Sequence, residues 1–439
     1  MRQPNPRSPF ELESEPTEIL SKAETFVNSL ITIVARWGQR QGPCPRCKSD
    51  FVKRHGTRAR KIRGHGGRRV IQVQRWRCCI CRKTWSEPIP GVAPFMRYSR
   101  AVIRKTLDMY VFGGSSLRIV AQMLRSEING TERARHWDPE GLEWPELPEH
   151  RKIRLSHTSV WRWLQEAGRR ANKDGNRFGE IWQSGIWVAD STLGKVKGVW
   201  IGVLGVADAV SRVVFETVRI AAESEEEVLR KFARLRGFGV NTKGIKGLVS
   251  DGADAYRLVL ASVMKRVVHQ RCVFHLWRNI GPHLRSLKET KGEERALAFK
   301  RAVRGVWDAA SYEDARLGLA ALLREWAGEP CVVPALRLIE ASFEEATTHL
   351  KGMVEGMPRT SNVVEWLWQG YKKRLRIMGQ FMSVGGMDSF NGVWALHVNF
   401  QRYQKRKERK RPVRNPGHCP LEMAGGQVAQ LSWMDVLAI

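Results

Sequence analysis

Residues 186–220 read IWVADSTLGKVKGVWIGVLGVADAVSRVVFETVRI, and this stretch decides the fold. It holds three runs rich in Val, Ile and Leu, at 186–189, 199–206 and 213–220, and short turns containing Gly, Asp or Ser separate them. Turns this short join antiparallel neighbours, because a parallel crossover needs a dozen or more residues. We therefore predict a three-stranded antiparallel meander.

The sequence that follows extends the meander into an α/β fold. We expect a helix over 224–236, a buried strand at 247–250, a second helix over 253–264 and a further strand at 267–273. The predicted order is βββαβαβ, a mixed sheet. In this order the first and fourth strands are neighbours.

Acidic residues follow two of these neighbouring strands. Asp190 comes directly after the apolar run 186–189, and Asp251 comes directly after 247–250. Buried carboxylates that converge repel each other unless a divalent cation lies between them. Glu365, at the start of a long helix that begins near Asn362, is the expected third acid. An alternative is that Asn362 caps this helix and Glu365 only reaches back as a capping-box side chain.

Two further acids compete for the same role. Asp208 lies in a hairpin turn, where Asp is common for backbone reasons alone, and Asp254 lies one helical turn after Asp251. We expect neither to take part in a metal site.

Four cysteines form two closely spaced pairs. The pairs are Cys44 with Cys47 and Cys78 with Cys81, each with two residues between. Four thiolates satisfy a tetrahedral Zn2+ ion and leave no open position for chemistry, so we predict a structural zinc ribbon. The alternatives are unmetallated buried thiols or a redox dithiol, and Cys79 could compete with Cys78 for the metal.

The basic residues are concentrated in a few segments. The net charge is +30, and residues 46–83 hold 14 basic residues and one acidic residue, whereas residues 402–414 hold eight and one. Residues 284–355 are nearly neutral, with 11 basic and 12 acidic residues, and are rich in helix-forming residues. Clustered Lys and Arg favour a nucleic-acid phosphate backbone as partner, although an RNA-coated or merely basic surface is an alternative.

Two segments are typical of a helix-turn-helix. Residues 116–124 and 156–164 have helical patterns, with Ser156 as an N-cap, but a long acidic insertion separates them. The second helix would present five side chains to base edges: Ser156, His157, Thr158, Ser159 and Arg162. The alternative is two ordinary amphipathic helices of a bundle.

Several motifs together resemble a known family. They are Asp190, Ser250-Asp251-Gly252, Cys272-Val273-Phe274-His275, and Thr360-Ser361-Asn362-Val363-Val364-Glu365 leading into Tyr371-Lys372-Lys373-Arg374-Leu375-Arg376. Over about residues 41–400 the chain resembles the Mutator-like and related bacterial insertion-sequence DDE transposases. The resemblance implies a ribonuclease H-like catalytic domain with Asp190, Asp251 and Glu365 as the triad. It also implies a helical insertion before the glutamate, a place that the neutral segment 284–355 occupies.

The resemblance implies a reaction as well. Three carboxylates can hold two Mg2+ ions, for which Mn2+ may substitute, and these support cleavage at element ends and transfer of the freed 3′-hydroxyl into target DNA. His275 would donate to the scissile phosphate; the alternative is a buried Cys272 and a helix-start histidine. Expected DNA contacts outside the helix-turn-helix are Arg46, Arg68, Arg69, Arg75, Lys372, Lys373, Arg374 and Arg376. For those after Glu365 the alternative is a solvated helix face.

The expected domain order follows from these segments. It comprises a lead and helix (1–40), a zinc ribbon (41–92), a helix-turn-helix domain with an inserted loop at about 126–155 (93–178), the first part of the catalytic core (179–283), a helical insertion (284–355), the final part of the core (356–400) and a basic tail (401–439). Double-stranded DNA, as inverted-repeat ends and target, is the expected partner, and a homodimer or higher oligomer is expected.

A non-catalytic DNA-binding regulator, or a structure-specific nuclease or resolvase on the same fold, are the alternative functions. The N-terminal residues lack an apolar signal core, and no apolar run approaches the roughly 18 residues of a membrane span. We therefore expect a cytoplasmic, nucleoid-associated protein in a reducing compartment, with no membrane association.

Overall fold

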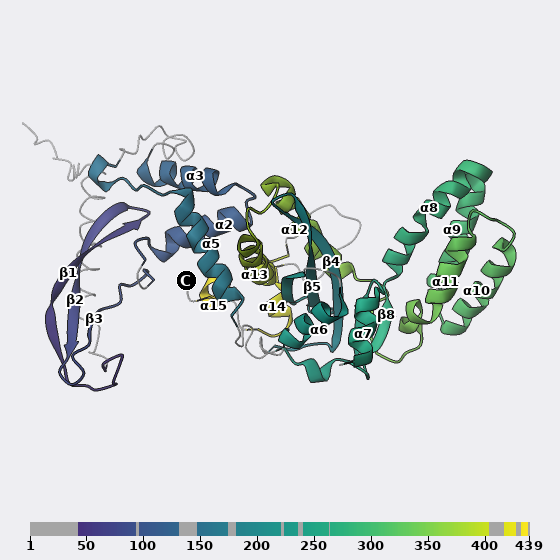
Figure 1. Cartoon of the computed structure of the whole chain (residues 1–439), viewed down its shortest axis with the longest axis horizontal. Helices are drawn as coiled ribbons and strands as arrows, with labels where there is room; N and C mark the ends of the chain where they lie inside the picture. The colour runs from purple at the N-terminus through teal and green to yellow at the C-terminus, as the bar shows by residue number, and fades with distance from the viewer. Residues whose placement is uncertain are drawn as a thin grey trace, which may run out of the picture. The chain divides into compact units, whose positions relative to one another are not determined.

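The computed structural model describes residues 43–93, 96–130, 147–173, 181–220, 224–235, 240–262, 264–403, 417–426 and 432–437 (Figure 1). The expected N-terminal lead and helix, much of the loop inserted in the helix-turn-helix and most of the basic tail lie outside these residues. The chain divides into two compact units. Of the described residues, the first unit contains those from 43 to 62 and from 69 to 97, and the second contains those from 63 to 68 and from 98 onward.

The first unit is built on a small three-stranded sheet. Its strands lie in the order β1-β2-β3, with β2 antiparallel to β3. Their bounds are β1 (Val52–Gly64), β2 (Gly67–Cys78) and β3 (Thr84–Ser86). Cys44 and Cys47 precede β1, Cys78 ends β2, and Cys81 lies in the turn before β3.

The second unit begins with three helices, each of which starts after a serine. They are α2 (Arg100–Val111), α3 (Leu117–Asn129) and α5 (His157–Ala171). Ser99, Ser116 and Ser156 are the N-caps, and each side chain accepts a hydrogen bond from a backbone N–H of the first turn. This bond satisfies a donor that has no partner within the helix. The two helices expected after Ser116 and Ser156 are therefore both present.

A five-stranded mixed sheet forms the centre of the second unit. Its order is β6-β5-β4-β7-β8, with β4, β5 and β6 antiparallel and β7 and β8 parallel to β4. The bounds are β4 (Ile186–Val196), β5 (Val199–Asp208), β6 (Val214–Ile220), β7 (Gly247–Ser250) and β8 (Val268–Arg271). The predicted strand order and the pairing of the first and fourth strands are confirmed.

The end of the first strand was predicted wrongly. Asp190 does not end β4, because the strand continues to Val196 and pairs with β5 up to a two-residue turn. The turn residues Lys197 and Gly198 have φ angles of 45° and 87°, the left-handed geometry that tight hairpins require. Polar and small residues after Asp190 hide this extension, since only one face of the strand is buried there, by Thr192, Gly194 and Val196.

Helices cover the two faces of the sheet. Opposite Asp190 on β5 lies Gly205, where a Cβ would come within 2.7 Å of Trp368 of α12 (Asn362–Met378). Paired residues share a face, so α12 covers the face to which Asp190 points. On the opposite face Trp187 packs against Phe232 of α6 (Glu225–Arg234), with ring centroids 6.0 Å apart.

A buried helix was not expected. Helix α13 (Val384–Phe400) follows α12, whereas the sequence indicated only one last helix before a tail from residue 401. Nearly every residue of α13 from Met387 onward is buried. Its apolar and small residues surround the whole helix, so no amphipathic period marks it.

Helices α8 to α11 form a separate hydrophobic core between β8 and α12. Their bounds are α8 (Val273–Lys291), α9 (Glu293–Trp307), α10 (Tyr312–Trp326) and α11 (Val333–Ala346). Helix α8 starts directly after β8, so the expected boundary at residue 284 lies inside a continuous helix. Gln270 of β8 donates a hydrogen bond to the carbonyl of Ala346, at 2.7 Å, and so ties this core to the sheet.

The remaining elements are short. They are α7 (Asp254–Ser262), α14 (Pro420–Met423), α15 (Trp433–Val436) and the 3-10 turns Glu149–Arg151, Thr242–Gly244 and Thr348–Leu350. Among the helices that the structure describes, none is both long enough and apolar enough to cross a membrane.

Candidate functional site

The register of the central strands brings Asp190 and Asp251 together. Pairing between β4 and β7 ends at Val188 opposite Val249. Asp190 and Asp251 each lie two residues beyond this last pair, on strands that run in the same direction. The two carboxylates therefore lie close together, as the sequence predicted. Asp190 lies within β4, whereas Asp251 directly follows β7.

Two helices add a histidine and a third acid. His275 lies in the first turn of α8, and one ligand atom each from Asp190, Asp251 and His275 lie within 4.8 Å of one another. Glu365 lies in the first turn of α12, with Oε1 3.4 Å from Nε2 of His275. The same Nε2 lies 3.7 Å from Oδ1 of Asp190. All four predicted residues therefore meet at one place.

The start of α12 is fixed by the cysteine of the Cys272-Val273-Phe274-His275 motif. The N-cap of α12 is Ser361, whose backbone N–H and hydroxyl both donate to Sγ of Cys272, at 3.3 and 3.2 Å. Cys272 is fully buried. Sequence reasoning missed this contact, because nothing in the spacing of Cys272 and Ser361 indicates that they meet.

The capping-box alternative for Glu365 is wrong. It required Asn362 as the N-cap, with Glu365 at the third helical position. The helix instead starts at Asn362, so Glu365 occupies the fourth position, and it extends to His275. The cap lies one residue earlier because Cys272 holds Ser361 in place.

Burial and like charge change the protonation of the site. Burial, followed by the charges of Glu365 and Asp251, raises the pKa of Asp190 to about 7, and Lys372 opposes this shift. Burial lowers the pKa of His275, although Asp251 and Glu365 act in the opposite direction. In the part of the chain that the structure describes, Nε2 of His275 is buried without a hydrogen-bond partner. A buried acid, two half-buried acids and an imidazole with an unused nitrogen are the donor set of a divalent cation site.

The donor atoms suit particular metals. Carboxylate oxygens are the ligands of Mg2+ and Mn2+, and Asp190, Asp251 and Glu365 offer them from three different elements. The residues present therefore fit a divalent cation. Their arrangement can hold a metal ion and present it at the edge of the sheet.

The competing acids have other roles. Asp208 is fully buried, and its carboxylate accepts hydrogen bonds from the backbone and hydroxyl groups of Ser184 and Ser211 and from the backbone of Val210. These bonds fix the turn between β5 and β6. Asp254 lies on the exposed side of α7, 3.5 Å from Arg257.

The four predicted zinc ligands form a second cluster, in the first unit. Their sulfur atoms all lie within 4.8 Å of one another. The Sγ atoms of Cys44 and Cys81 are 3.5 Å apart, and those of Cys47 and Cys78 are 3.6 Å apart. Four sulfurs at 2.3 Å from a tetrahedral zinc ion would be about 3.8 Å apart, so this cluster fits zinc. Cys79 is exposed and stands outside it.

The predicted DNA-contact residues outside α12 are mostly accessible. Arg46 and Arg69 are exposed, and Arg68 and Arg75 are half-buried. On α5 and its cap four residues are exposed and Ser159 is half-buried; the exposed ones are Ser156, His157, Thr158 and Arg162. The hydroxyls of Ser156 and Ser159 are hydrogen-bonded to each other at 3.2 Å, so both take part in capping the helix.

The basic residues of α12 do not share one environment. Lys372, Lys373 and Arg376 are exposed, whereas Arg374 is only 3% exposed. Arg374 is therefore not part of a solvated helix face. Its guanidinium donates to the carbonyl of Ser115 at 3.0 Å and lies 4.6 Å from the ring centre of Tyr110.

Comparison with known families agrees with this site. Residues 188–385 match the family model described as the transposase, Mutator family, and this range contains Asp190, Asp251, His275 and Glu365. Residues 44–121 match a model described as a domain of unknown function, DUF6431. No curated protein matches the chain. The resemblance inferred from the motifs is thereby confirmed over residues 188–385.

Proposed function

We propose that this chain, whose residues 188–385 match the Mutator transposase family, is a metal-dependent DDE transposase that cleaves the ends of an insertion sequence and joins them to target DNA. The observation that carries the proposal is the convergence of Asp190, Asp251 and His275 within 4.8 Å, with Glu365 3.4 Å from the histidine. The family match supports a DNA transposase, and this geometry supports the particular reaction.

The sheet supports a ribonuclease H-like catalytic domain. Three antiparallel strands are followed by two parallel ones, and the central strand β4 carries the first acid. The helical core of α8 to α11 lies in the chain between the second acid and Glu365. We propose that it is an insertion in the catalytic domain, with the core on both sides of it.

The chain's own residues would prepare the phosphodiester for attack. Asp190, Asp251 and Glu365 would hold two Mg2+ ions, or Mn2+, which when bound supply activation of the attacking hydroxyl and stabilisation of the leaving oxygen. His275, kept neutral by burial, would donate a hydrogen bond to the scissile phosphate. Lys372 would offset part of the negative charge beside Asp190.

Three regions outside the carboxylates would hold the DNA. In the first unit the zinc-bound cysteines would keep the sheet rigid, so that Arg46, Arg69 and Arg75, with Arg68 at the hairpin end, contact phosphates. Helix α5 would present His157, Thr158 and Arg162 to base edges in the major groove. Exposed Lys372, Lys373 and Arg376 would contact the backbone near the cut. Since an element has two ends, we propose that a dimer or larger assembly acts on them.

The experiment that tests the proposal uses the full chain and the inverted repeats that flank its coding region. End-labelled duplexes carrying these repeats are incubated with Mg2+, Mn2+ or EDTA and resolved on denaturing gels. We expect specific nicks at the repeat ends with either metal. Asp190→Asn, Asp251→Asn and Glu365→Gln should each reduce cleavage at least 100-fold while retaining DNA binding.

Asp254→Asn provides the matched control. Asp254 is an exposed acid only three residues after Asp251, so its loss should leave cleavage within twofold. If all three site variants cut as well as the parent, the assignment of the triad is wrong. If the parent binds the ends but does not cut them with either metal, the chain is a DNA-binding regulator.

A further inference from the structure

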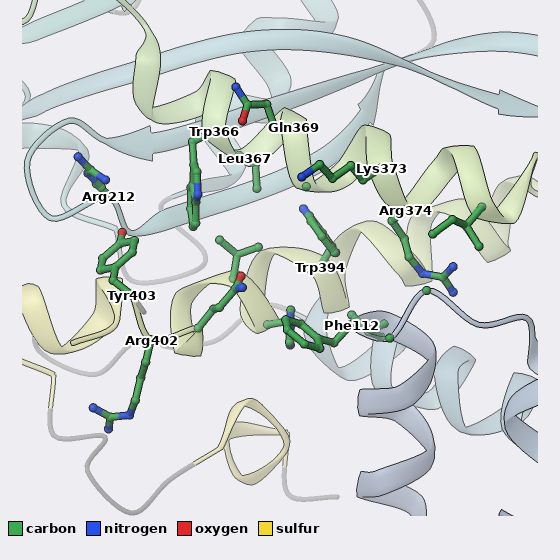
Figure 2. Close-up of a pocket in the computed structure, with 18 residues that line it drawn as sticks. Phe112, Arg212, Trp366, Leu367, Gln369, Lys373, Arg374, Trp394, Arg402 and Tyr403 are labelled. Atoms are coloured by element: carbon green, nitrogen blue, oxygen red, sulfur yellow. The ribbon is translucent and has the colours of Figure 1, made fainter. Parts of the chain in front are cut away.

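A cavity of about 780 Å³ lies beside α12 (Figure 2). Trp366, Lys373 and Arg374 of this helix line it, whereas Glu365 does not. Helices α12 and α13 border it, together with the chain segments that follow α2, β5 and α13. All of these belong to the second unit. The proposed cleavage reaction does not use this cavity, although its size is that of a small-molecule site.

Aromatic rings form much of its wall. Figure 2 shows Trp366 of α12, Trp394 of α13 and Tyr403 bordering the same space. The ring centroids of Trp366 and Tyr403 lie 5.9 Å apart with a tilt of 54° between their planes. Trp366 is half-buried, so part of its ring is open to a ligand. Walls of this kind suit a flat aromatic group, because every nucleobase can stack on a tryptophan or tyrosine ring.

The charged groups that line the cavity are all positive. They are Arg212, Lys373, Arg374 and Arg402, and no Asp or Glu occurs among the described lining residues. Arg402 is paired with Glu422 at 2.9 Å, and Arg212 lies over the ring of Tyr403. Lys373 is exposed. The lining therefore favours an anionic ligand.

Arg374 gives the strongest indication of a ligand. Its side chain is buried, and the structure gives Nε and Nη1 no hydrogen-bond partner among the described residues. Only Nη2 is bonded, to the carbonyl of Ser115. A buried guanidinium without an anion is costly, and its two unused N–H groups can each donate a hydrogen bond to a phosphate oxygen.

We propose that this cavity takes one unstacked nucleotide of the bound DNA, with its base among Trp366, Trp394 and Tyr403 and its phosphate on Arg374 and Lys373. Trp366 directly follows Glu365, so the nucleotide would be one near the cut. A phosphate group alone would not explain the aromatic side chains of the cavity, and an apolar ligand would leave the buried guanidinium without an anion. A nucleotide matches both. The inference rests on the proposed function, because it takes the substrate to be DNA.

The test compares three 30-base-pair duplexes of one sequence, bound by the full chain without added Mg2+ or Mn2+ so that no cleavage occurs. The first is fully paired, the second carries one unpaired adenine at its centre, and the third carries an abasic residue at that position. We expect the unpaired adenine to be bound about tenfold more tightly than the abasic residue, since stacking on one aromatic ring is worth about this factor. Trp366→Ala should reduce the difference below twofold, and Trp366→Phe should retain most of it.

Further variants separate the two parts of the site. Lys373 is exposed, so Lys373→Gln should not disturb the fold. It should lower the affinity for the adenine and the abasic duplex severalfold each and leave the ratio of the two affinities unchanged. Trp200→Ala removes another exposed tryptophan, 63% accessible and outside the cavity, and should keep the tenfold ratio. Circular dichroism confirms that each variant is folded.

The outcomes are distinct from those of the cleavage experiment. A parent protein that binds the adenine and abasic duplexes equally overturns the inference, even if it cleaves element ends. Competition by micromolar free dAMP overturns it too, because the cavity would then be a site for a soluble nucleotide. A tenfold preference that Trp366→Ala removes supports it, whether or not cleavage is observed.

Discussion

At Asp190, burial and neighbouring negative charge act in the same direction, and both favour the protonated carboxyl. Its pKa of about 7 exceeds the value of an unfolded chain, close to 4. The folded chain therefore binds more protons than the unfolded chain between pH 4 and 7. In the absence of metal, the stability that this residue contributes is lost as the pH rises through that interval.

A substitution at Asp190 tests whether stability falls with rising pH because of this residue. In EDTA at pH 8, Asp190→Asn should raise the Tm, because it removes a buried charge whose cost is up to roughly 4 kcal/mol for a pKa shift of this size. The difference in Tm should shrink as the pH falls towards 4, since the aspartate is then protonated in the folded chain and increasingly so in the unfolded chain. Adding 10 mM Mg2+ at pH 8 should raise the Tm of the parent only. Equal pH profiles in EDTA would contradict the buried-charge account.

Cys272 is a positioning residue for Glu365, because its sulfur accepts both donors of the α12 cap. Cys272→Ala leaves the backbone N–H and hydroxyl of Ser361 without this acceptor, at a cost of about 1–3 kcal/mol, and loosens the turn that carries Glu365. We expect a lower Tm and a severalfold lower kcat at unchanged DNA affinity. Cys272→Ser should recover part of both losses, a rescue that simple loss of packing does not give.

The control is Cys331→Ala, a half-buried cysteine in the helical core. It should leave kcat unchanged. An alanine at 272 that cuts DNA at the parental rate would show that the cap does not position the glutamate.

Among the elements, α12 depends on its close approach to β5. Gly205→Ala would place a Cβ 2.7 Å from Trp368 and 3.1 Å from Leu367, so the helix would have to move away from the sheet. Overpacking of this kind costs typically 1–3 kcal/mol. Because Gly205 lies opposite Asp190, the shift would also separate Glu365 from the other acids. We expect a Tm several degrees lower and cleavage reduced by tenfold or more.

Gly281→Ala is the matched control for this substitution. It lies within α8, and no atom lies within 4 Å of the position that its Cβ would take. Alanine favours a helix by about 1 kcal/mol over glycine, and this gain offsets the restriction that Pro282 places on the preceding residue, so the Tm should change little. A Gly205→Ala protein that behaves like Gly281→Ala would show that α12 has room to adjust.

The sequence predicted elements with a local signal and missed those without one. Helical patterns marked the helices after Ser116 and Ser156, with Ser156 also predicted as a cap, and apolar runs marked the strands in their correct order. The extension of β4 to Val196 had no such signal, because it depends on pairing with β5. The burial of α13 had none either, because it depends on the elements that pack around the helix.

The same distinction applies to the candidate site. Asp190 and Asp251 could be placed together from strand order, because each acid follows the apolar run of one of two neighbouring parallel strands. The approach of Glu365 to His275 depends on how the chain returns after the four helices α8 to α11, and no local pattern encodes that path. The cavity beside α12 was missed for a similar reason: Arg374 is one of several basic residues in the sequence, and only the folded chain shows that it is buried.

For the whole molecule, the division into two compact units predicts two separable unfolding events. The first unit has few apolar residues in its interior, with Cys44 and Cys78 among its most buried side chains, so its stability should depend on metal bound by the four cysteines. The second unit contains the large cores around the mixed sheet and the helices α8 to α11, and no zinc is needed for either.

We therefore expect about one zinc per chain and two calorimetric transitions in the full protein. Cys47→Ser should abolish zinc binding and remove or strongly lower the first transition while leaving the second within about 2 °C. Cys79→Ser, an exposed neighbour outside the cluster, should retain both the zinc and the first transition. Specific end binding should fall in Cys47→Ser, because the basic surface of the first unit loses its rigid support, while metal binding by Asp190 and its partners should persist. If removing zinc lowered both transitions together, the two units would be one cooperative structure, and the zinc site would then support the catalytic part directly.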